Sequence, residues 1–212
     1  LEAPDTSSFA GGCLERVESW SSLIAYVLDT LNDVSSATRI SLMLSETERR
    51  SLRLHAGHGV HESLIGTVRC PLGTGIAGRA AALGRITAGR GSTGGPRGYA
   101  GSAYVVLPLG QEDECEGVVN ITGLPGDTLP SSEILKTWAE LGKHAGNAIK
   151  GARSLRRAQS ASTTDTLTGL PNRLAFEGAL KREMERARRA GSSLAIGVCD
   201  VDLFKGFNDR YG

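Results

Sequence analysis

Apolar residues recur along two stretches of the chain at alternating steps of three and four, the period of one face of an α-helix. The first stretch runs from Leu14 to Val34 and predicts an amphipathic helix. The second follows Ser131 and Ser132, either of which suits an N-cap, and predicts a long helix. Its apolar stripe has heptad-like spacing and consists of Trp138, Leu141, Ala145, Ala148, Ala152 and Leu155.

This stripe is compatible with two arrangements. It extends further than one domain is expected to cover, so we predict a helical connector at 152–164 that pairs with the same helix of a second copy of the chain. The alternative is that the helix packs wholly on the sheet of its own chain.

Period-two patterns bounded by turn residues predict two β-hairpins between these helices. The first joins Arg39–Leu44 to Ser51–His55, and the second joins Ala103–Leu109 to Glu116–Thr122. A brief strand is expected at Ile86–Ala88. The N-terminal part is therefore expected to combine an antiparallel sheet with helices, an α+β arrangement.

Glycine, serine and proline mark the irregular segments. Residues 1–13 predict a tail or linker. Residues 89–101 contain six glycines and predict a mobile loop. The sequence GTGIAG at 73–78 lacks the Gly-Lys-Ser/Thr ending of a phosphate-binding loop, so we interpret it as a tight turn that opens a short helix.

Composition narrows the class of protein. The net charge of +1 gives no reason to expect nucleic acid or a membrane as a partner. The four cysteines are widely spaced without a CxxC pair, which is typical of free thiols in a reducing cytoplasm. The chain begins with Leu1 rather than methionine, so we expect it to be part of a longer protein.

Three histidines and two cysteines raise the question of a bound group. His55, His58 and His61 suggest a metal or haem site, but three-residue steps along a strand alternate faces, so the imidazoles converge only where the chain bends. Cys70 and Cys115 offer anchors for a chromophore, although a lone cysteine usually packs as a small apolar residue.

The order of helix, hairpin, CPLGTGIAGRA, glycine loop, SAYVVLPLG, EGVVNITG and long helix resembles a GAF domain, over residues 14–151. The resemblance implies a six-stranded antiparallel sheet with helices behind it and a pocket for a small molecule in front. The NKxnFxxxDE signature of members that bind cyclic nucleotides is absent, so the identity of a GAF ligand stays open.

A second kind of chemistry is concentrated near the C-terminus. Leu194–Cys199 is an apolar run that predicts a buried strand, and Asp200 and Asp202 follow directly. Carboxylates at a strand end suit a hard divalent cation. Lys205 adds positive charge for a phosphate, and Asn208 can both donate to and accept from a base edge.

Two motifs, DTLTGLPNR at 165–173 and LAIGVCDVDLFKGFNDRYG at 194–212, resemble the start of the GGDEF domain of diguanylate cyclases. The resemblance implies a truncated α/β nucleotide-cyclase-like domain at 165–212. It also implies that Asp165, Asn172 and Arg173 form the structural entrance turn of this domain, where Asp165 and Arg173 are expected to pair.

The same resemblance assigns roles in the site. Asp200 matches the catalytic, metal-binding aspartate, and the carbonyl of Val201 would hold the same Mg²⁺ or Mn²⁺ ion. Asn208 matches the residue that hydrogen-bonds guanine. The loop that binds the triphosphate matches Leu203, Phe204 and Lys205.

These roles predict a cytoplasmic GAF-regulated diguanylate cyclase that condenses two GTP into cyclic di-GMP and pyrophosphate, working as a homodimer. The GG(D/E)EF signature itself is not within the sequence, so residues 1–212 are expected to be inactive alone. The alternative is a sensory module in which a degenerate GGDEF domain binds GTP or a partner without turnover.

Overall fold

The computed structural model describes residues 5–46, 49–92, 99, 101–111, 114–165 and 167–211, without the side chains of residues 160–162. The chain forms two compact units, Leu1–Arg157 and Ala158–Gly212. We describe each unit by itself. No helix in the described ranges is both long and apolar enough to cross a bilayer.

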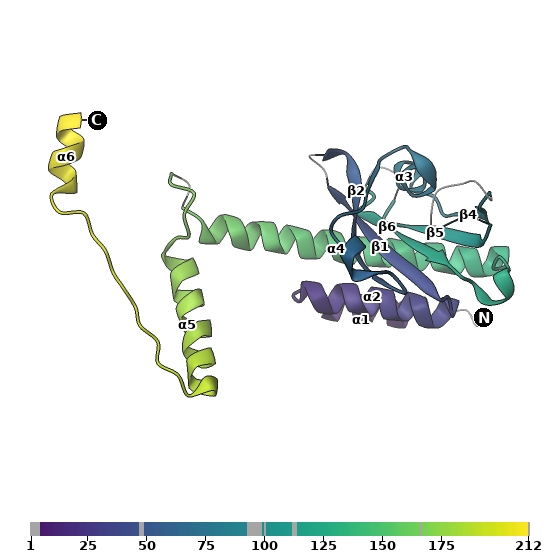
Figure 1. Ribbon diagram of the computed structural model, residues 1–212, viewed down its shortest axis with the longest axis horizontal. Coiled ribbons are helices and arrows are strands. Elements are labelled where there is room, and N and C mark those ends of the chain that lie inside the picture. Colours follow the sequence, from purple (N-terminus) through teal and green to yellow (C-terminus); the bar gives the residue numbers. More distant parts are fainter. Residues whose placement is uncertain are drawn as a thin grey trace. The chain divides into compact units, whose positions relative to one another are not determined.

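The first unit is built on a six-stranded sheet (Figure 1). Its spatial order is β3-β2-β1-β6-β5-β4, and every neighbouring pair is antiparallel. Both predicted hairpins are confirmed, because β1 pairs with β2 and β5 pairs with β6. The strands are β1 (Arg39–Glu46), β2 (Ser51–His58), β3 (Arg69–Pro71), β4 (Thr87–Arg90), β5 (Ala103–Leu109) and β6 (Gly117–Thr122).

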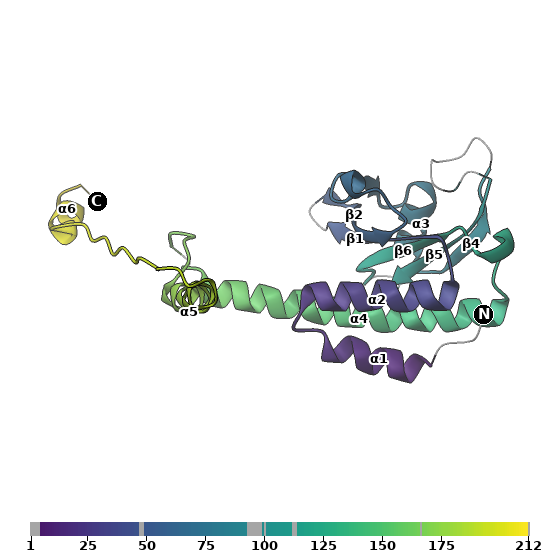
Figure 2. The same ribbon diagram turned by 60° about the horizontal axis from the view of Figure 1, so that its bottom comes forward.

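Helices cover both faces of this sheet. Figure 2 shows α2 and α4 side by side beneath one face, with α1 outside them and α3 across the opposite face. The main core lies between the sheet and α1, α2 and α4, and a smaller apolar cluster lies under α3. The bounds of these helices are α1 (Thr6–Glu15), α2 (Trp20–Ser35), α3 (Gly75–Leu83) and α4 (Ser132–Thr163), with short 3₁₀ turns at Glu62–Leu64 and Pro125–Asp127.

The N-terminal segment departs from the prediction. Residues 6–15 form α1 where a tail is predicted, and the next helix begins at Trp20 instead of Leu14. The tail interpretation was wrong because Phe9 and Cys13 are buried, with Phe9 stacked on Tyr26 at a ring separation of 5.6 Å. Phe9 and Cys13 lie one helical turn apart, so both face the core from the same side of α1.

The apolar stripe of α4 lies mainly against the sheet of its own chain, as in the alternative arrangement, and pairing of the connector at 152–164 with a second copy stays a prediction. Its members from Trp138 to Ala152 are buried in the main core, and Leu155 is the one partly exposed member. Gly142 and Gly146 allow this close packing, because a Cβ atom there would overlap the Pro108 carbonyl oxygen and the Gly110 nitrogen, respectively.

The predicted glycine loop is described only in part. Gly89 and Arg90 belong to β4, while residues 93–98 and 100 lie outside the described residues, so the prediction of mobility there is untested. The edge of the sheet is fixed nearby by Asp127, whose carboxylate accepts from the Ala103 amide at 2.7 Å and pairs with Arg90. The amide and the guanidinium hold the pKa of Asp127 below its usual range.

The second unit consists of a turn at 163–172, the helix α5 (Arg173–Ala190), an irregular extended stretch and the helix α6 (Phe204–Tyr211). The strand predicted at Leu194–Cys199 is not formed, and no side chain described in this unit is buried. A strand needs a neighbour to accept and donate its backbone hydrogen bonds, and none lies beside this stretch within the described part of the unit.

Candidate functional site

The residues predicted to bind metal and nucleotide lie together in sequence at the start of α6. Asp200 and Val201 precede the helix, and the chain reverses at Leu203, which has a left-handed φ of 57°. The Phe204 amide donates to the Val201 carbonyl at 3.3 Å, and the Phe207 amide donates to Leu203 at 3.1 Å. This turn delivers the exposed acids directly to the N-terminus of a helix.

Some of the ligand atoms that Mg²⁺ prefers are present at this turn. The Asp200 carboxylate and the Val201 carbonyl are oxygen ligands, which Mg²⁺ prefers. Lys205 and Asn208 stand three residues apart on α6 and so share one side of it. Within the described residues no three His, Cys, Asp or Glu side chains converge on one point. The role of Asp200 and Val201 as metal ligands therefore stays a prediction.

The entrance turn is held by its own hydrogen bonds. One Asp165 carboxylate oxygen accepts from the amide and the hydroxyl of Thr168, at 2.8 and 2.6 Å. These bonds hold the pKa of Asp165 below its usual range. Arg173 donates to Glu177 at 2.9 Å, so the expected pairing of Asp165 with Arg173 is not present.

Asn172 has a clear local role at this turn. Its side-chain oxygen accepts from the Ala175 amide at 3.2 Å, which makes it the N-cap of α5. Its own amide donates to the Thr163 carbonyl at 2.8 Å, which connects the end of α4 to the start of α5 through the turn. A capping residue of this kind fixes where a helix begins.

The first unit contains a separate cavity of about 830 Å³ on the α3 face of the sheet. This front pocket is open on one side, with walls of Met43, Leu54, Val60, Leu64, Val68, Ile76 and Ala77. The predicted tight turn at 73–78 forms part of its rim, with Gly73 and Gly75 at φ values of 81° and 60°. Arg39 and His61 are exposed residues that also line it.

A short polar network interrupts the apolar lining. The Tyr99 hydroxyl donates to the Asn120 side-chain oxygen at 2.5 Å, and the Asn120 amide donates to the Ser41 hydroxyl at 3.2 Å. Burial raises the pKa of Tyr99, which keeps its hydroxyl protonated. The pocket can thus bind a mainly apolar ligand that carries a few hydrogen-bonding groups.

This network was not predicted from the sequence. One signal was available, since Asn120 is a polar residue inside the otherwise apolar run of β6. A buried amide of this kind requires hydrogen-bond partners.

The histidines and cysteines do not form one site. His55 accepts from the Trp20 indole at 3.0 Å, whereas His58 pairs with Asp29 and His61 with Ser63. The three imidazoles therefore have three different partners.

Of the two cysteines considered as anchors, Cys70 lines the front pocket. Cys115 donates to the Gly117 carbonyl at 3.0 Å, and burial raises its pKa, which disfavours the reactive thiolate.

Comparison with known sequences concerns the second unit. Residues 162–212 match the family described as "Diguanylate cyclase, GGDEF domain". The chain is 49% identical over 49 residues to diguanylate cyclase DgcP of Pseudomonas aeruginosa, covering 23% of this chain and 7% of that protein. It is 38% identical over 65 residues to the probable diguanylate cyclase DgcC of Escherichia coli, covering 31% and 18%. The chain thus spans less than a fifth of the length of these relatives.

Comparison with solved structures concerns the first unit. The GAF domain of a phosphoenolpyruvate-protein phosphotransferase from Coxiella burnetii matches with a TM-score of 0.60 and 16% identity, covering 74% of this chain and 99% of that one. The corresponding Acinetobacter domain matches with a TM-score of 0.58 and 13% identity, covering 74% and 99%. At these identities the likeness establishes the fold. The chain therefore joins a GAF fold to a GGDEF region.

Proposed function

We propose that this chain belongs to a GAF-regulated diguanylate cyclase, which condenses two GTP into cyclic di-GMP and pyrophosphate. The observation that carries the proposal is the GGDEF match at 162–212, which includes Asp200 and Val201 in the turn before α6. Helix N-termini favour phosphate, because their first amides point outward without intrahelical partners.

The residues at this turn divide the work of binding one GTP. Asp200 and the Val201 carbonyl would hold Mg²⁺ or Mn²⁺, which when bound lowers the charge that opposes attack at phosphorus. The backbone at Leu203 and Phe204 would accept the triphosphate, and Lys205 would offset its charge. Asn208 would donate to and accept from the guanine edge.

The reaction follows from placing two such sites face to face. The 3′-hydroxyl oxygen of one GTP forms a bond to the α-phosphorus of the other, the bond from that phosphorus to the bridging oxygen breaks, and pyrophosphate leaves while the hydroxyl proton passes to solvent. A second round with the roles exchanged closes the ring. Each domain holds one GTP, so a homodimer is required.

The front pocket supplies the regulatory input in this proposal. Its apolar walls and the Tyr99–Asn120–Ser41 network suit a small molecule. The strands that line it belong to the same sheet that packs on α4, and α4 runs on to the entrance turn at Asp165. A ligand that shifts this sheet would therefore act on α4.

Synthesis of cyclic di-GMP by the whole protein that contains this chain tests the proposal. With GTP and Mg²⁺, the Asp200→Ala variant should lose roughly a hundredfold or more in rate, as expected when a charge-stabilising contact is removed. Asp209→Asn, an exposed acid on α6 without an assigned role, serves as the control and should retain the rate. No product from the unaltered protein, or full activity in Asp200→Ala, would refute the proposal.

The second candidate is a GTP-binding receptor without turnover, which would use the same predicted contacts at Phe204, Lys205 and Asn208. Radiolabelled GTP retained by the whole protein, with no cyclic di-GMP formed at any Mg²⁺ concentration, would support the receptor over the enzyme.

A further inference from the structure

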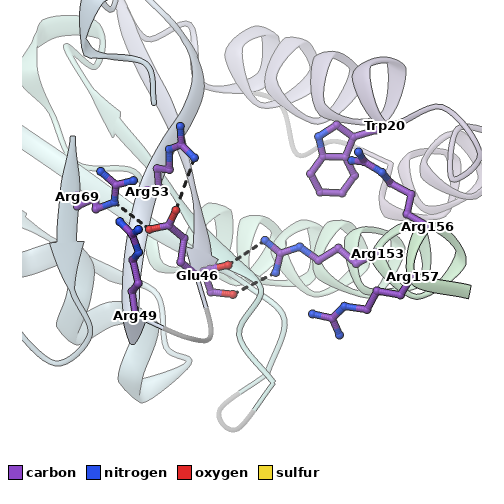
Figure 3. A pocket seen from close by; sticks show the side chains of 9 residues that line it. Trp20, Glu46, Arg49, Arg53, Arg69, Arg153, Arg156 and Arg157 are labelled. Atoms are coloured by element: carbon purple, nitrogen blue, oxygen red, sulfur yellow. Dashed lines mark hydrogen bonds and ion pairs between the residues drawn. The ribbon is translucent and has the colours of Figure 1, made fainter. Parts of the chain in front are cut away.

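A second cavity of the first unit lies on its other side, where α4 passes the β1–β2 hairpin and β3. This arginine pocket has a volume of about 580 Å³ and is open to solvent. Figure 3 shows arginines from the strands facing arginines from α4 around it. Its lining consists of Trp20, Ser45, Glu46, Arg49, Arg53, Arg69, Arg153, Arg156 and Arg157.

Three of these six arginines form ion pairs, and they share two carboxylates. Glu46 accepts from Arg69 at 2.9 Å and lies 3.6 Å from Arg53, and these contacts hold the pKa of Glu46 below its usual range, with the Arg69 hydrogen bond contributing most (Figure 3). Arg153 pairs with Glu116 and donates to the Ser45 carbonyl at 3.1 Å.

The other three arginines form no close ion pair among the residues that the structure describes, although the charge of Arg49 also acts on Glu46. Arg49, Arg156 and Arg157 are exposed, and none of them forms an ion pair within those ranges. The whole chain carries a net charge of only +1, so this is a local concentration of positive charge. Like charges held close together repel one another, and a bound anion would relieve that repulsion.

The positive charge of this pocket also affects the pKa of a neighbouring histidine. Burial lowers the pKa of His55, and the charges of Arg153, Arg53 and Arg156 lower it further. Neutral His55 then accepts from the Trp20 indole at 3.0 Å, which fixes the ring at the edge of the pocket. The guanidinium of Arg156 lies over that ring at 5.3 Å.

We propose that the arginine pocket binds a small anion bearing two or more adjacent phosphate groups. Guanidinium groups form paired, charge-assisted hydrogen bonds to phosphate oxygens, and the excess of six arginines over two carboxylates calls for more than one negative charge on the ligand. The cavity volume lies within the range of small-molecule sites.

Binding there would connect two elements of the unit. Arg49 belongs to the β1–β2 hairpin region, whereas Arg156 and Arg157 follow Ala152, the last fully buried residue of α4. An anion held by both sets would fasten this part of α4 to the hairpin. The inference concerns the first unit alone and does not depend on the proposed cyclase being active.

Calorimetric titration of the chain with sodium pyrophosphate, without added divalent metal, tests the proposal. Saturable binding at one site is expected, weakening with rising salt because both partners are charged. The Arg156→Gln/Arg157→Gln variant should weaken binding at least about tenfold, the loss expected for two charge-assisted contacts. Arg188→Gln/Arg189→Gln is the matched control, since it removes two adjacent exposed arginines from α5 and should keep the affinity.

Two further variants show whether pyrophosphate binds in the arginine pocket or at α6. Arg49→Gln should also weaken pyrophosphate binding, because it removes a guanidinium from the opposite wall. Lys205→Ala removes the lysine assigned to the triphosphate at α6, so it separates any pyrophosphate binding there from binding in the arginine pocket. Equal affinity in the Arg156/Arg157 pair and its control, or loss of binding only in Lys205→Ala, would overturn the proposal, and the latter result would support phosphate binding at α6.

A membrane surface is the competing source of phosphate charge. Vesicles of phosphatidylglycerol should compete poorly with pyrophosphate for a recessed pocket. Vesicle binding that is lost in Arg156→Gln/Arg157→Gln, with no pyrophosphate binding in solution, would overturn the proposal and assign the arginines to a lipid surface.

Discussion

At the scale of single residues, the carboxylate of Asp165 is set by hydrogen bonds rather than by an ion pair. Both donors come from Thr168, only three residues away, so the interaction is complete within one turn. The expected partner Arg173 instead donates to Glu177 on its own helix. Asp165 bonds to Thr168 rather than to Arg173 because Thr168 is closer in sequence, and a local contact orders fewer dihedral angles than a distant one.

The turn at Asp165 should therefore depend on pH. Its pKa is lowered in the folded turn, so the carboxylate stabilises the turn fully above the ordinary aspartate value of about 4, and this stabilisation is lost as pH falls through the lowered value. NMR titration of the carboxyl carbon measures the midpoint. Thr168→Val removes the hydroxyl donor and should move the midpoint upward, towards the ordinary value.

The amide of Thr168 remains as a donor in that variant, so the upward movement should be partial. An unchanged midpoint in Thr168→Val would show that the hydroxyl does not hold the carboxylate.

Single-residue roles at the candidate site were predictable only where a motif carried them. Asp200, Lys205 and Asn208 were selected because a rare pattern surrounds them, and their roles stay predictions. The arginine pocket had no such pattern, since Arg49 and Arg156 are more than a hundred positions apart. Packing between strands and α4 brings them together, and no local signal encodes that.

At the scale of elements, α4 packs on the sheet at backbone-to-backbone distance. Two glycines on α4, Gly142 and Gly146, approach the backbone of β5 and the residue that follows it. Periodicity predicted the stripe on this helix correctly, and its members from Trp138 to Ala152 pack on the sheet of their own chain. An apolar stripe gives the direction of burial, and the same spacing serves a sheet or another helix.

A pair of glycine substitutions on α4 measures this contact. Gly146→Ala should destabilise the unit by about 1–3 kcal/mol, because its Cβ would meet backbone atoms that cannot move aside. Gly151→Ala, whose nearest neighbour is 3.9 Å away, should stabilise it by about 0.5–1 kcal/mol through helix propensity. Urea unfolding of the two variants gives both values. Equal effects of the same sign would contradict the close packing.

At the scale of the whole molecule, burial is confined to one unit. The first unit holds all the core residues of the described chain, whereas Leu167, Val198 and Leu203 of the second unit are each about nine-tenths exposed. Helices in proteins gain most of their stability from a packed apolar face, and α5 and α6 bury no described side chain. The two units should therefore differ greatly in local stability.

Hydrogen exchange should reveal that difference. Amides of β1, β5 and β6 should be protected up to the global stability, while those of α5 and α6 should exchange quickly through local opening. Mass spectrometry of exchanged peptides separates the two classes. Comparable protection of α5 and the central strands would contradict this assignment of the core.

The fold of the first unit was largely predictable, and that of the second was not. Hairpins depend on contacts between neighbouring segments, so period-two patterns located β1–β2 and β5–β6. The strand expected at Leu194–Cys199 would need partners that the described residues do not supply. An apolar run indicates only a propensity to form a strand, and the strand forms only where a neighbouring strand can pair with it.

The position of the last buried residue of α4 also matters for protein engineering. Ala152 ends the packed part of the helix well before its end at Thr163, and the first unit closes at Arg157. A chimera joined after Arg157 would carry every described core side chain of the GAF fold with it. Lengthening or shortening the helix after Arg157 by whole heptads would nearly preserve the direction in which the following domain is attached. The first unit should therefore remain folded when it is fused to a different output domain.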